Sequence, residues 1–454
     1  MELPTRLALL LVLGLGTACG GGDRESGAAD TTGARADAAG TAAADTASVS
    51  FPDGFRGTVF AEDLGGARHA AASPAGDLYV NTWRSPYDTT RKVPAGGYVV
   101  ALRDSDRDGR AEEIRRFGPT SESGSRGGTG IAVFRGAVYV EADSMILRYR
   151  LSDGALVPSG APDTIVIGLP ASGGHPMHPI AIDSAGNLYV NLGSDTNACQ
   201  QQDRQPESRG HQPCRELERR AGIWRFSADR TGQRYRPADR YATGIRNAVG
   251  LAVTAGGELY ATQHGRDQLA QNWPKLFDWQ ESANLPAEEL LRIERGADYG
   301  WPYCYYDPGQ GKLVLAPEYG GDKQKVGQCS EKRGPVAVFP AHWAPNALAF
   351  YTGTAFPEKY RGGAFIAFHG SWNRAPEPQE GYNVVFQPMA DGKASGEYEI
   401  FADGFAGARK EPGLSEHRPS GLAVGPEGAL YITDDQAGTV WRVEYAGAAT
   451  ARRP

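Results

Sequence analysis

The sequence predicts an all-β protein with the architecture of a six-bladed β-propeller, and three observations lead to this prediction. The 454 residues include 60 glycines and 30 prolines spread along the chain, which indicates many turns. No helical period of apolar residues extends beyond the N-terminal segment, so little helix is expected. One phrase, a glycine followed by a small or polar residue and an alternating apolar strand, occurs six times, starting at Gly76, Gly136, Gly186, Gly257, Gly363 and Gly428.

Each copy of this phrase is expected to be one strand of a small antiparallel sheet. An apolar stretch ending in a turn precedes most copies, as in LAVTAGGELY, which is typical of two strands joined by a tight turn. A second phrase, the expected next strand, follows several copies, at Ile146, Gly222, Glu289 and Thr439. Copies start 60, 50, 71, 106 and 65 residues apart, so the step of 106 must contain insertions, expected mainly at 266–330. Six such sheets indicate radial repetition, whereas two β-sandwiches, the alternative, would not explain one recurring phrase.

The N-terminus resembles a bacterial lipoprotein signal. Arg6 precedes the apolar run Leu7–Leu15, which is too short to span a bilayer, and small residues then lead to Cys19. Residues 1–19 are therefore expected to direct export, with lipidation of Cys19 or ordinary secretion as the two outcomes. Residues 20–50, almost wholly Gly, Ala, Thr, Asp and Ser, are expected to form a disordered linker, and 51–446 the propeller. The expected location is the periplasm or the outer membrane, to which the protein would be attached only through an N-terminal lipid.

Charge and cysteine content add two constraints. The formal net charge of −7 argues against a nucleic-acid surface, which needs a basic stripe. With Cys19 set aside for lipid, four cysteines remain, and an even number in an oxidising compartment indicates disulfides. Of three connectivities, the local pairs Cys199–Cys214 and Cys304–Cys329 are the simplest. A zinc site is the weaker alternative, because no CxxC spacing or histidine cluster accompanies these cysteines.

Polar residues gather just ahead of the expected strands. Five of the eight histidines lie there, namely His69, His175, His178, His342 and His417. A histidine at a channel mouth suits general-base chemistry near neutral pH, although a loop histidine often just bonds the backbone. Arg246 and Asn247 in GIRNAVGL suit an oxyanion or a quinone carbonyl, and Arg418 holds the matching place in the last repeat. The motif HGSWNR places His369, Trp372 and Arg374 after another strand.

The segment LRDSDRDGRAEE predicts a calcium loop. Asp104, Asp106 and Asp108 alternate ahead of a glycine, as in calcium-binding loops. The twelfth position is Arg115, so the loop is not an EF-hand, and Glu113 is the substitute ligand in this interpretation. An acidic surface turn is the alternative.

The motifs GGHPMH, GIRNAVGL, ADYGWPYCYY, AFYTGTAFPEKYRG, FHGSWNR and HRPSGLAVGPEG, in this order over residues 51–446, give the chain a family resemblance. It resembles the soluble sugar dehydrogenases that use pyrroloquinoline quinone, and most of all their sorbosone and pyranose branch. The resemblance implies oxidation of a sugar by hydride transfer to this quinone, with calcium as second cofactor. It also implies an external electron acceptor, a quinone or a cytochrome.

The resemblance implies roles for single residues. His175 matches the base that removes the sugar hydroxyl proton, and Arg246 and Asn247 match the pair beside the reactive quinone carbonyl. Arg418 matches an arginine that holds a cofactor carboxylate. Metal ligands are implied at the backbone carbonyls of Gly265 and Arg266, for the cofactor's calcium, and at Glu288 and Glu289, for a structural calcium.

Three positions depart from the glucose-oxidising branch. That branch has a glutamine where Gly128 stands, an aspartate where Ser194 stands, next to Asp195, and a cofactor-binding lysine near Ser371. His369 or Arg374 is the expected replacement for this lysine, and glucose is the least expected sugar.

Two other function classes compete with the enzyme. The first is a non-catalytic propeller that binds carbohydrate or an envelope protein. The second is a metal-dependent lactonase of the six-bladed type. A lactonase needs a cluster of Glu, Asn and Asp ligands on the channel axis, which the sequence does not assemble. A binding module has no need of His175, Arg246 and Arg418 together, so these three residues favour the enzyme.

Overall fold

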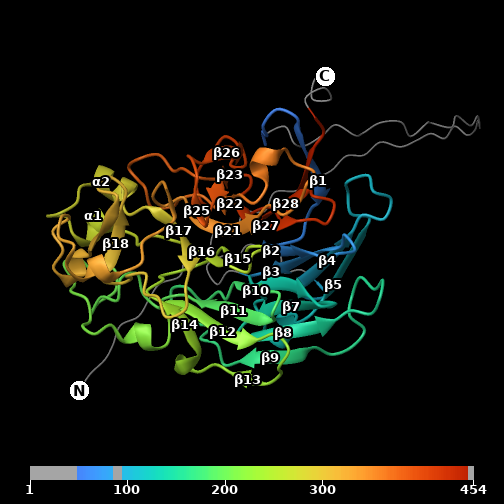
Figure 1. The fold of residues 1–454 in the computed structure, drawn as a ribbon, viewed down its shortest axis with the longest axis horizontal. Coiled ribbons are helices and arrows are strands. Elements are labelled where there is room, and N and C mark those ends of the chain that lie inside the picture. Colours follow the sequence, from blue (N-terminus) through green and yellow to red (C-terminus); the bar gives the residue numbers. More distant parts are fainter. Residues whose placement is uncertain (1–48, 85–94, 448–454) are drawn as a thin grey trace, which may run out of the picture. The chain divides into compact units, whose positions relative to one another are not determined.

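Six sheets arranged around a common centre make up the fold (Figure 1), and they are antiparallel except where the short β13 pairs parallel with β9. The structure is a computed structural model and describes residues 49–84 and 95–447. Cys19, the expected signal segment and nearly all of the expected linker lie outside the described residues. No helix in the described part is long and apolar enough to cross a membrane.

Each sheet is one blade, and its strands follow one another from the inside of the ring outward. Blade 1 consists of β2 (Ala67–Ala72), β3 (Leu78–Thr82), β4 (Val99–Arg103) and β5 (Glu113–Phe117). Blade 2 consists of β6 (Ile131–Phe134), β7 (Ala137–Ala142), β8 (Met145–Arg150) and β9 (Asp163–Ile167), with β13 (Gln233–Arg234) added at its outer edge. Blade 3 consists of β10 (Ile180–Ile182), β11 (Asn187–Leu192), β12 (Gly222–Ser227) and β14 (Arg240–Thr243). Blade 4 is β15 (Leu251–Val253), β16 (Leu259–Gln263), β17 (Glu288–Ile293) and β20 (Ala337–Phe339); blade 5 is β21 (Pro345–Phe350), β22 (Ala364–Phe368), β23 (Asn383–Gln387) and β26 (Glu399–Ala402); blade 6 is β27 (Pro419–Val424), β28 (Leu430–Asp434), β29 (Val440–Tyr445) and β1 (Phe55–Ala61).

The six inner strands close a ring, which confirms the predicted six-bladed propeller. Each inner strand contacts the next along the chain, from β2 to β27, and β27 contacts β2 again. The N-terminal strand β1 completes blade 6 by pairing antiparallel with β29. This pairing brings Phe55 edge-on against Phe356, Tyr360 and Phe401 of blade 5. The sequence phrases do not assign β1 to any blade, because it lacks the recurring phrase.

The recurring phrase forms the second strand of every blade, as predicted. Its glycine adopts a left-handed φ at five of the six copies, for example +98° at Gly76 and +89° at Gly428, which L side chains rarely adopt. In blade 5 the left-handed residue is instead Gly362, one position earlier, with φ +73°. The tight turn between inner and second strands therefore explains the glycine in the pattern.

The insertion expected at 266–330 is in fact two excursions on either side of β17. The first, residues 264–287, contains the helices α1 (Leu269–Asn272) and α2 (Trp279–Asn284). The second, residues 294–336, contains the hairpin β18 (Cys304–Asp307) and β19 (Lys312–Leu315). The prediction of one continuous insertion was wrong because the residues ELLRI form β17, a regular blade strand, between the two excursions. The hairpin β24 (Met389–Ala390) and β25 (Lys393–Ala394) is a separate two-stranded sheet in the connection between β23 and β26 of blade 5. Six 3-10 helices complete the fold of the described residues, at Ser121–Ser123, Arg215–Glu218, Pro237–Asp239, Pro317–Tyr319, Gly327–Glu331 and Glu358–Tyr360.

Two disulfides close the loops that stand beside blades 3 and 4. Cys199 is bonded to Cys214, and Cys304 to Cys329. Replacing both cysteines of either pair by serine is expected to lower the free energy of unfolding by about 2–4 kcal/mol, because each bridge restricts the unfolded chain. Urea unfolding of the two double variants and the wild type measures this difference. Unfolding midpoints that match the wild type would contradict the expectation.

Candidate active site at one end of the propeller

The strand directions bring the predicted polar residues to one end of the ring. Every inner strand begins at this end and every second strand finishes there, because the two are antiparallel. We call this end the upper face. It carries the loops ahead of β10, β15, β21 and β27 and the loops after β11, β16, β22 and β28, which hold the motifs singled out in the sequence.

His175 is held so that one ring nitrogen remains for chemistry. Its Nδ1 lies 2.9 Å from the main-chain oxygen of Ser194 and 3.0 Å from the Ser194 hydroxyl. A carbonyl can only accept, so Nδ1 carries the proton and Nε2 presents a lone pair. Burial, followed by the positive charge of Arg246, holds the pKa of His175 well below its usual value. The imidazole is therefore a neutral base at neutral pH.

His178, the other histidine of the same motif, has a structural environment. It is 1% exposed, and its Nδ1 lies 3.1 Å from Oε1 of Glu141 while Nε2 lies 3.1 Å from the oxygen of Pro170. Glu141 also accepts the main-chain N–H groups of Thr129, Gly130 and His178. Both ring nitrogens are engaged in contacts within the protein, so His178 has a structural role.

Arg246 is buried beside His175 and is held on several sides. It is 3% exposed, and Ser194, which binds His175, also donates its main-chain N–H to the oxygen of Arg246 at 2.7 Å. The guanidinium donates to both oxygens of Asn197, to the oxygen of Gly265 at 2.9 Å and to Oδ2 of Asp267 at 2.8 Å. These bonds use four of the five N–H donors of an arginine and leave one on Nη1.

The side-chain amide of Asn247 indicates that the site binds a polar ligand. Its side-chain oxygen is buried and has no hydrogen-bond partner among the described residues. A Cβ placed on Gly193 would lie 2.5 Å from Cβ of His175 and 3.1 Å from this oxygen, so both side chains flank Gly193. Buried amides in proteins are normally satisfied, so an open one beside a neutral base and an arginine fits a polar ligand.

Arg418 and His369 form a second polar corner on the upper face. Arg418 donates from Nε to the oxygen of His369 at 3.0 Å and from Nη2 to the oxygen of Gly370 at 2.9 Å. His369 contacts Oδ1 of Asp435 at 2.8 Å, and Arg68 binds Oδ2 of the same carboxylate at 2.6 Å. Burial, followed by the charge of Arg418, lowers the pKa of His369 to about 4.

The loop after β22 is tightly fixed and displays a tryptophan. Arg374 donates to the oxygens of Pro378, Ala283 and Ala341 and pairs with Glu380, so it ties this loop to α2. Its predicted cofactor contact stays a prediction. Trp372 on the same loop is 53% exposed.

The predicted metal ligands after β16 and on β17 have mixed surroundings. Both oxygens of Glu288 accept main-chain N–H groups, from Gly265 at 2.8 Å and Ala344 at 3.0 Å. Glu289 accepts from Gln263 through Oε1, and its buried Oε2 has no partner among the described residues. Burial raises the pKa of each glutamate to about 8. Neighbouring strand residues point to opposite faces, so the pair does not converge on one ion.

The acidic loop between β4 and β5 is folded as a cluster. Ligand oxygens of Asp104, Asp106, Asp108 and Glu112 lie within 4.8 Å of one another. The glutamate that joins the three aspartates is thus Glu112, whereas Glu113, the predicted substitute ligand, pairs with Arg115 at 3.4 Å. Calcium at this loop stays a prediction.

Several residues at this face carry no sequence signal of their role. Arg68 and Asp435, 367 positions apart, meet only because the ring closes between blades 6 and 1. Asn197 and Asp267 bind Arg246, and His264 lies close enough to lower the pKa of His175. His342 and His417 instead turn to Ser282 and Asp434. No repeated phrase marks these partners.

Comparisons with known proteins place this chain in a family. The chain is 26% identical over 234 residues to the pyrroloquinoline quinone-dependent pyranose dehydrogenase of Coprinopsis cinerea, covering 44% of this chain and 30% of that protein. It is 28% identical over 206 residues to an uncharacterized protein of Borreliella burgdorferi, covering 45% of this chain and 48% of that protein. The chain thus matches less than half the length of these two relatives.

Solved structures share the fold. The holo form of the Coprinopsis cinerea pyranose dehydrogenase quinone domain has a TM-score of 0.67 at 19% identity, covering 87% of this chain and 97% of that one. The calcium structure of the Trichoderma reesei enzyme of carbohydrate-active family AA12 has a TM-score of 0.68 at 18% identity, covering 88% and 97%. The family model described as TrAA12-like matches residues 50–446, and the chain therefore belongs to the TrAA12-like family.

Proposed function

We propose that this protein is a sugar dehydrogenase that uses pyrroloquinoline quinone and calcium. The observation that carries the proposal is the pair at the upper face: a neutral His175 with its tautomer fixed by Ser194, and Arg246 bonded to the same serine. Oxidation of an alcohol needs a base at the hydroxyl and positive charge near the hydride acceptor. The related pyranose dehydrogenase supports the choice of cofactor and of a sugar substrate.

The residues at the upper face fit this cofactor. The quinone carries carboxylates and carbonyl oxygens, which need hydrogen-bond donors and positive charge. Arg246, Arg418 and Arg68 supply that charge, and the open side-chain oxygen of Asn247 supplies an acceptor for a donor of the ligand. We assign the quinone to Arg246, Asn247, His369 and Arg418, and its calcium to the carbonyls of Gly265 and Arg266.

The chain's own groups then carry the proton chemistry. When bound, the quinone accepts hydride and calcium polarises it as a Lewis acid. Nε2 of His175 accepts the proton of the sugar hydroxyl, while Ser194 keeps the ring oriented through Nδ1. The remaining N–H on Nη1 of Arg246 stabilises the negative charge that develops on the acceptor oxygen.

Cofactor binding followed by turnover tests the proposal. The purified protein without cofactor is titrated with the quinone in the presence of calcium, and dye reduction is then measured with a panel of aldoses and ketoses. We expect binding that requires calcium, and sugar-dependent dye reduction. Sugar binding without any uptake of the quinone would instead favour the non-catalytic binding module.

Trp372 is the aromatic side chain that the fixed loop offers to the substrate. An exposed indole on a braced loop provides a flat apolar surface for a sugar ring. Changing Trp372 to alanine is expected to raise KM for the preferred sugar about tenfold while kcat changes less than twofold. Trp279, 50% exposed on α2, is the control, and its alanine variant is expected to keep both constants. An unchanged KM in Trp372→Ala would exclude this role.

The finer identity of the substrate and the cellular setting follow from the sequence motifs. We propose a pyranose or sorbosone-like sugar, an external quinone or cytochrome as electron acceptor, and an exported protein attached to the membrane through a lipid on Cys19. Labelling of the expressed protein with radioactive palmitate, and its loss in Cys19→Ala, tests the anchor. Equal labelling of both proteins would contradict it.

A further inference from the structure

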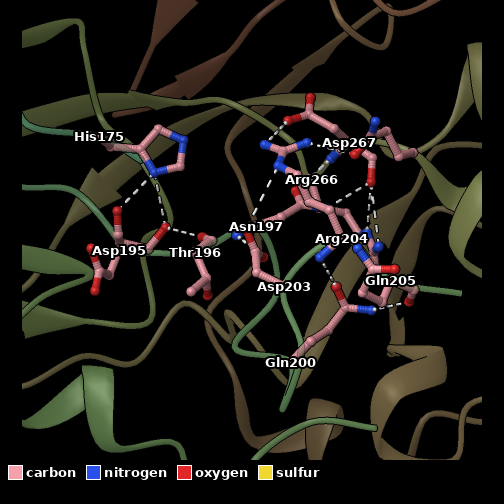
Figure 2. A network of polar contacts seen from close by, with 12 residues as sticks. His175, Asp195, Thr196, Asn197, Gln200, Asp203, Arg204, Gln205, Arg266 and Asp267 are labelled. Atoms are coloured by element: carbon pink, nitrogen blue, oxygen red, sulfur yellow. Dashed lines mark hydrogen bonds and ion pairs between the residues drawn. The ribbon is translucent and has the colours of Figure 1, made fainter. Parts of the chain in front are cut away.

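Asn197 is a buried polar residue that belongs to none of the sequence motifs. It lies in the loop that follows β11, two positions ahead of the disulfide of Cys199, and it is 0% exposed. In Figure 2, Asn197 lies between His175 on one side and Asp267 on the other. Burying an amide is costly unless its hydrogen bonds are made, so its contacts indicate what it does.

Asn197 binds the guanidinium of Arg246 at two points. Its main-chain oxygen accepts from Nε at 3.0 Å, and its side-chain Oδ1 accepts from Nη2 at 2.9 Å. Two acceptors on two different nitrogens of a planar cation fix its rotation as well as its position. Without Oδ1, the guanidinium keeps three of its four hydrogen bonds but loses one of the two acceptors that hold Nη2.

The same amide also holds the carboxylate partner of Arg246. Nδ2 of Asn197 donates to the main-chain oxygen of Asp267 at 2.9 Å, and the main-chain N–H of Asp267 donates to Oδ1 at 2.9 Å. Asp267 then accepts Nη2 of Arg246 at 2.8 Å through Oδ2. Burial alone would raise the pKa of Asp267, but Arg246 and then Arg204 lower it below its usual range. Asn197, Asp267 and Arg246 thus form a closed triangle of hydrogen bonds, in which the amide binds the main chain of Asp267 and the guanidinium binds its carboxylate.

The loop around Asn197 is itself anchored, so the amide cannot follow a displaced arginine. Its main-chain N–H donates to Oδ1 of Asp203 at 3.0 Å, and the indole N–H of Trp301 donates to its main-chain oxygen at 3.1 Å. Asn373 donates to Oδ1 of Asp267 at 2.8 Å, which links the triangle to the loop that carries Trp372.

We propose that Asn197 is a positioning residue that fixes the guanidinium of Arg246 in the orientation its catalytic role needs. The catalytic consequence rests on the proposed function. Asn197→Ala removes all three side-chain bonds and leaves the main-chain ones. A catalytic group displaced by an ångström can cost about 10²-fold in rate, so kcat is expected to fall by up to about 10²-fold with little change in KM.

A double-mutant cycle separates positioning from general structural support. In the Arg246→Ala background, adding Asn197→Ala is expected to change kcat less than twofold, because no guanidinium is left to position. The proposal would be overturned if Asn197→Ala lowered kcat as much in the Arg246→Ala background as in the wild type. A kcat equal to that of the wild type in the single variant Asn197→Ala would also overturn it. Asn383→Ala, which removes another buried asparagine (3% exposed, on β23), is the control and is expected to keep kcat.

A measurement on the protein without cofactor decides the inference independently of the proposed function. The charged or titratable groups acting on His175 are Arg246, Asp267 and His264. If the guanidinium moves away in Asn197→Ala, the pKa of His175, followed by NMR, rises toward its ordinary value, while Asn383→Ala leaves it unchanged. An unchanged titration in Asn197→Ala would overturn the inference. If the wild type shows no quinone-dependent turnover, the proposed function is refuted, and the titration of His175 alone then tests whether Asn197 positions Arg246.

Discussion

Changing His175 to glutamine is expected to lower kcat by about 10²–10⁴-fold while the quinone still binds. General-base catalysis contributes about this factor, and glutamine keeps a hydrogen-bonding side chain of similar size but has no basic nitrogen. Steady-state dye reduction and quinone titration of the same variant measure the two quantities separately. His178→Gln is the control: it removes a buried contact to Glu141, so it is expected to cost stability and much less turnover.

The pH dependence of the wild type follows from the same histidine. The base must be neutral, and burial together with Arg246 lowers its pKa well below the usual value. Activity is therefore expected to be lost only as pH falls below the ordinary range of histidine, and kcat/KM is expected to be flat around neutrality. An acid limb at the ordinary histidine value would contradict the assigned environment.

Changing Arg246 to alanine is expected to lower kcat by about 10²–10³-fold, the usual effect of removing one donor to a developing oxyanion. Loss of its charge is also expected to raise the pKa of His175, so the acid limb of kcat/KM moves to higher pH. Profiles of kcat/KM between pH 4 and 8 measure both effects. Arg148→Ala is the control, because this arginine is 5% exposed and binds Asp163 of blade 2. A large rate loss with an unmoved acid limb would contradict the placement of Arg246 beside His175.

The blade structure was predictable because it repeats. A second strand with a left-handed glycine ahead of it recurs six times, so the phrase identifies each blade even without its partners. Strand β1 has no such copy, and its place is set only by pairing with β29 at the other end of the chain. The prediction of one continuous insertion was wrong even though the phrase at Glu289 indicates a strand inside it, because β17 divides the irregular residues into two parts.

The candidate site was predictable only where its residues lie in recognisable motifs. His175, Arg246 and Arg418 stand at matching places ahead of inner strands, so the repeat itself brought them to one face. Asn197 and Arg68 bind residues of this face through pairings 49 and 367 positions apart, which no local pattern reveals. The alternating aspartates indicated the acidic loop, but the choice between Glu112 and Glu113 depended on which way the following strand turned its side chains.

Mixing the quinone-loaded protein with sugar in the absence of oxygen and external acceptor tests the central claim most directly. In a single turnover the absorbance of the bound oxidised quinone is followed in the wild type and in His175→Gln carrying the same amount of cofactor. The proposed function predicts rapid loss of this absorbance in the wild type and a loss slower by orders of magnitude in the variant. Reduction at equal rates in the two proteins, or no reduction by any sugar in the wild type, would contradict it.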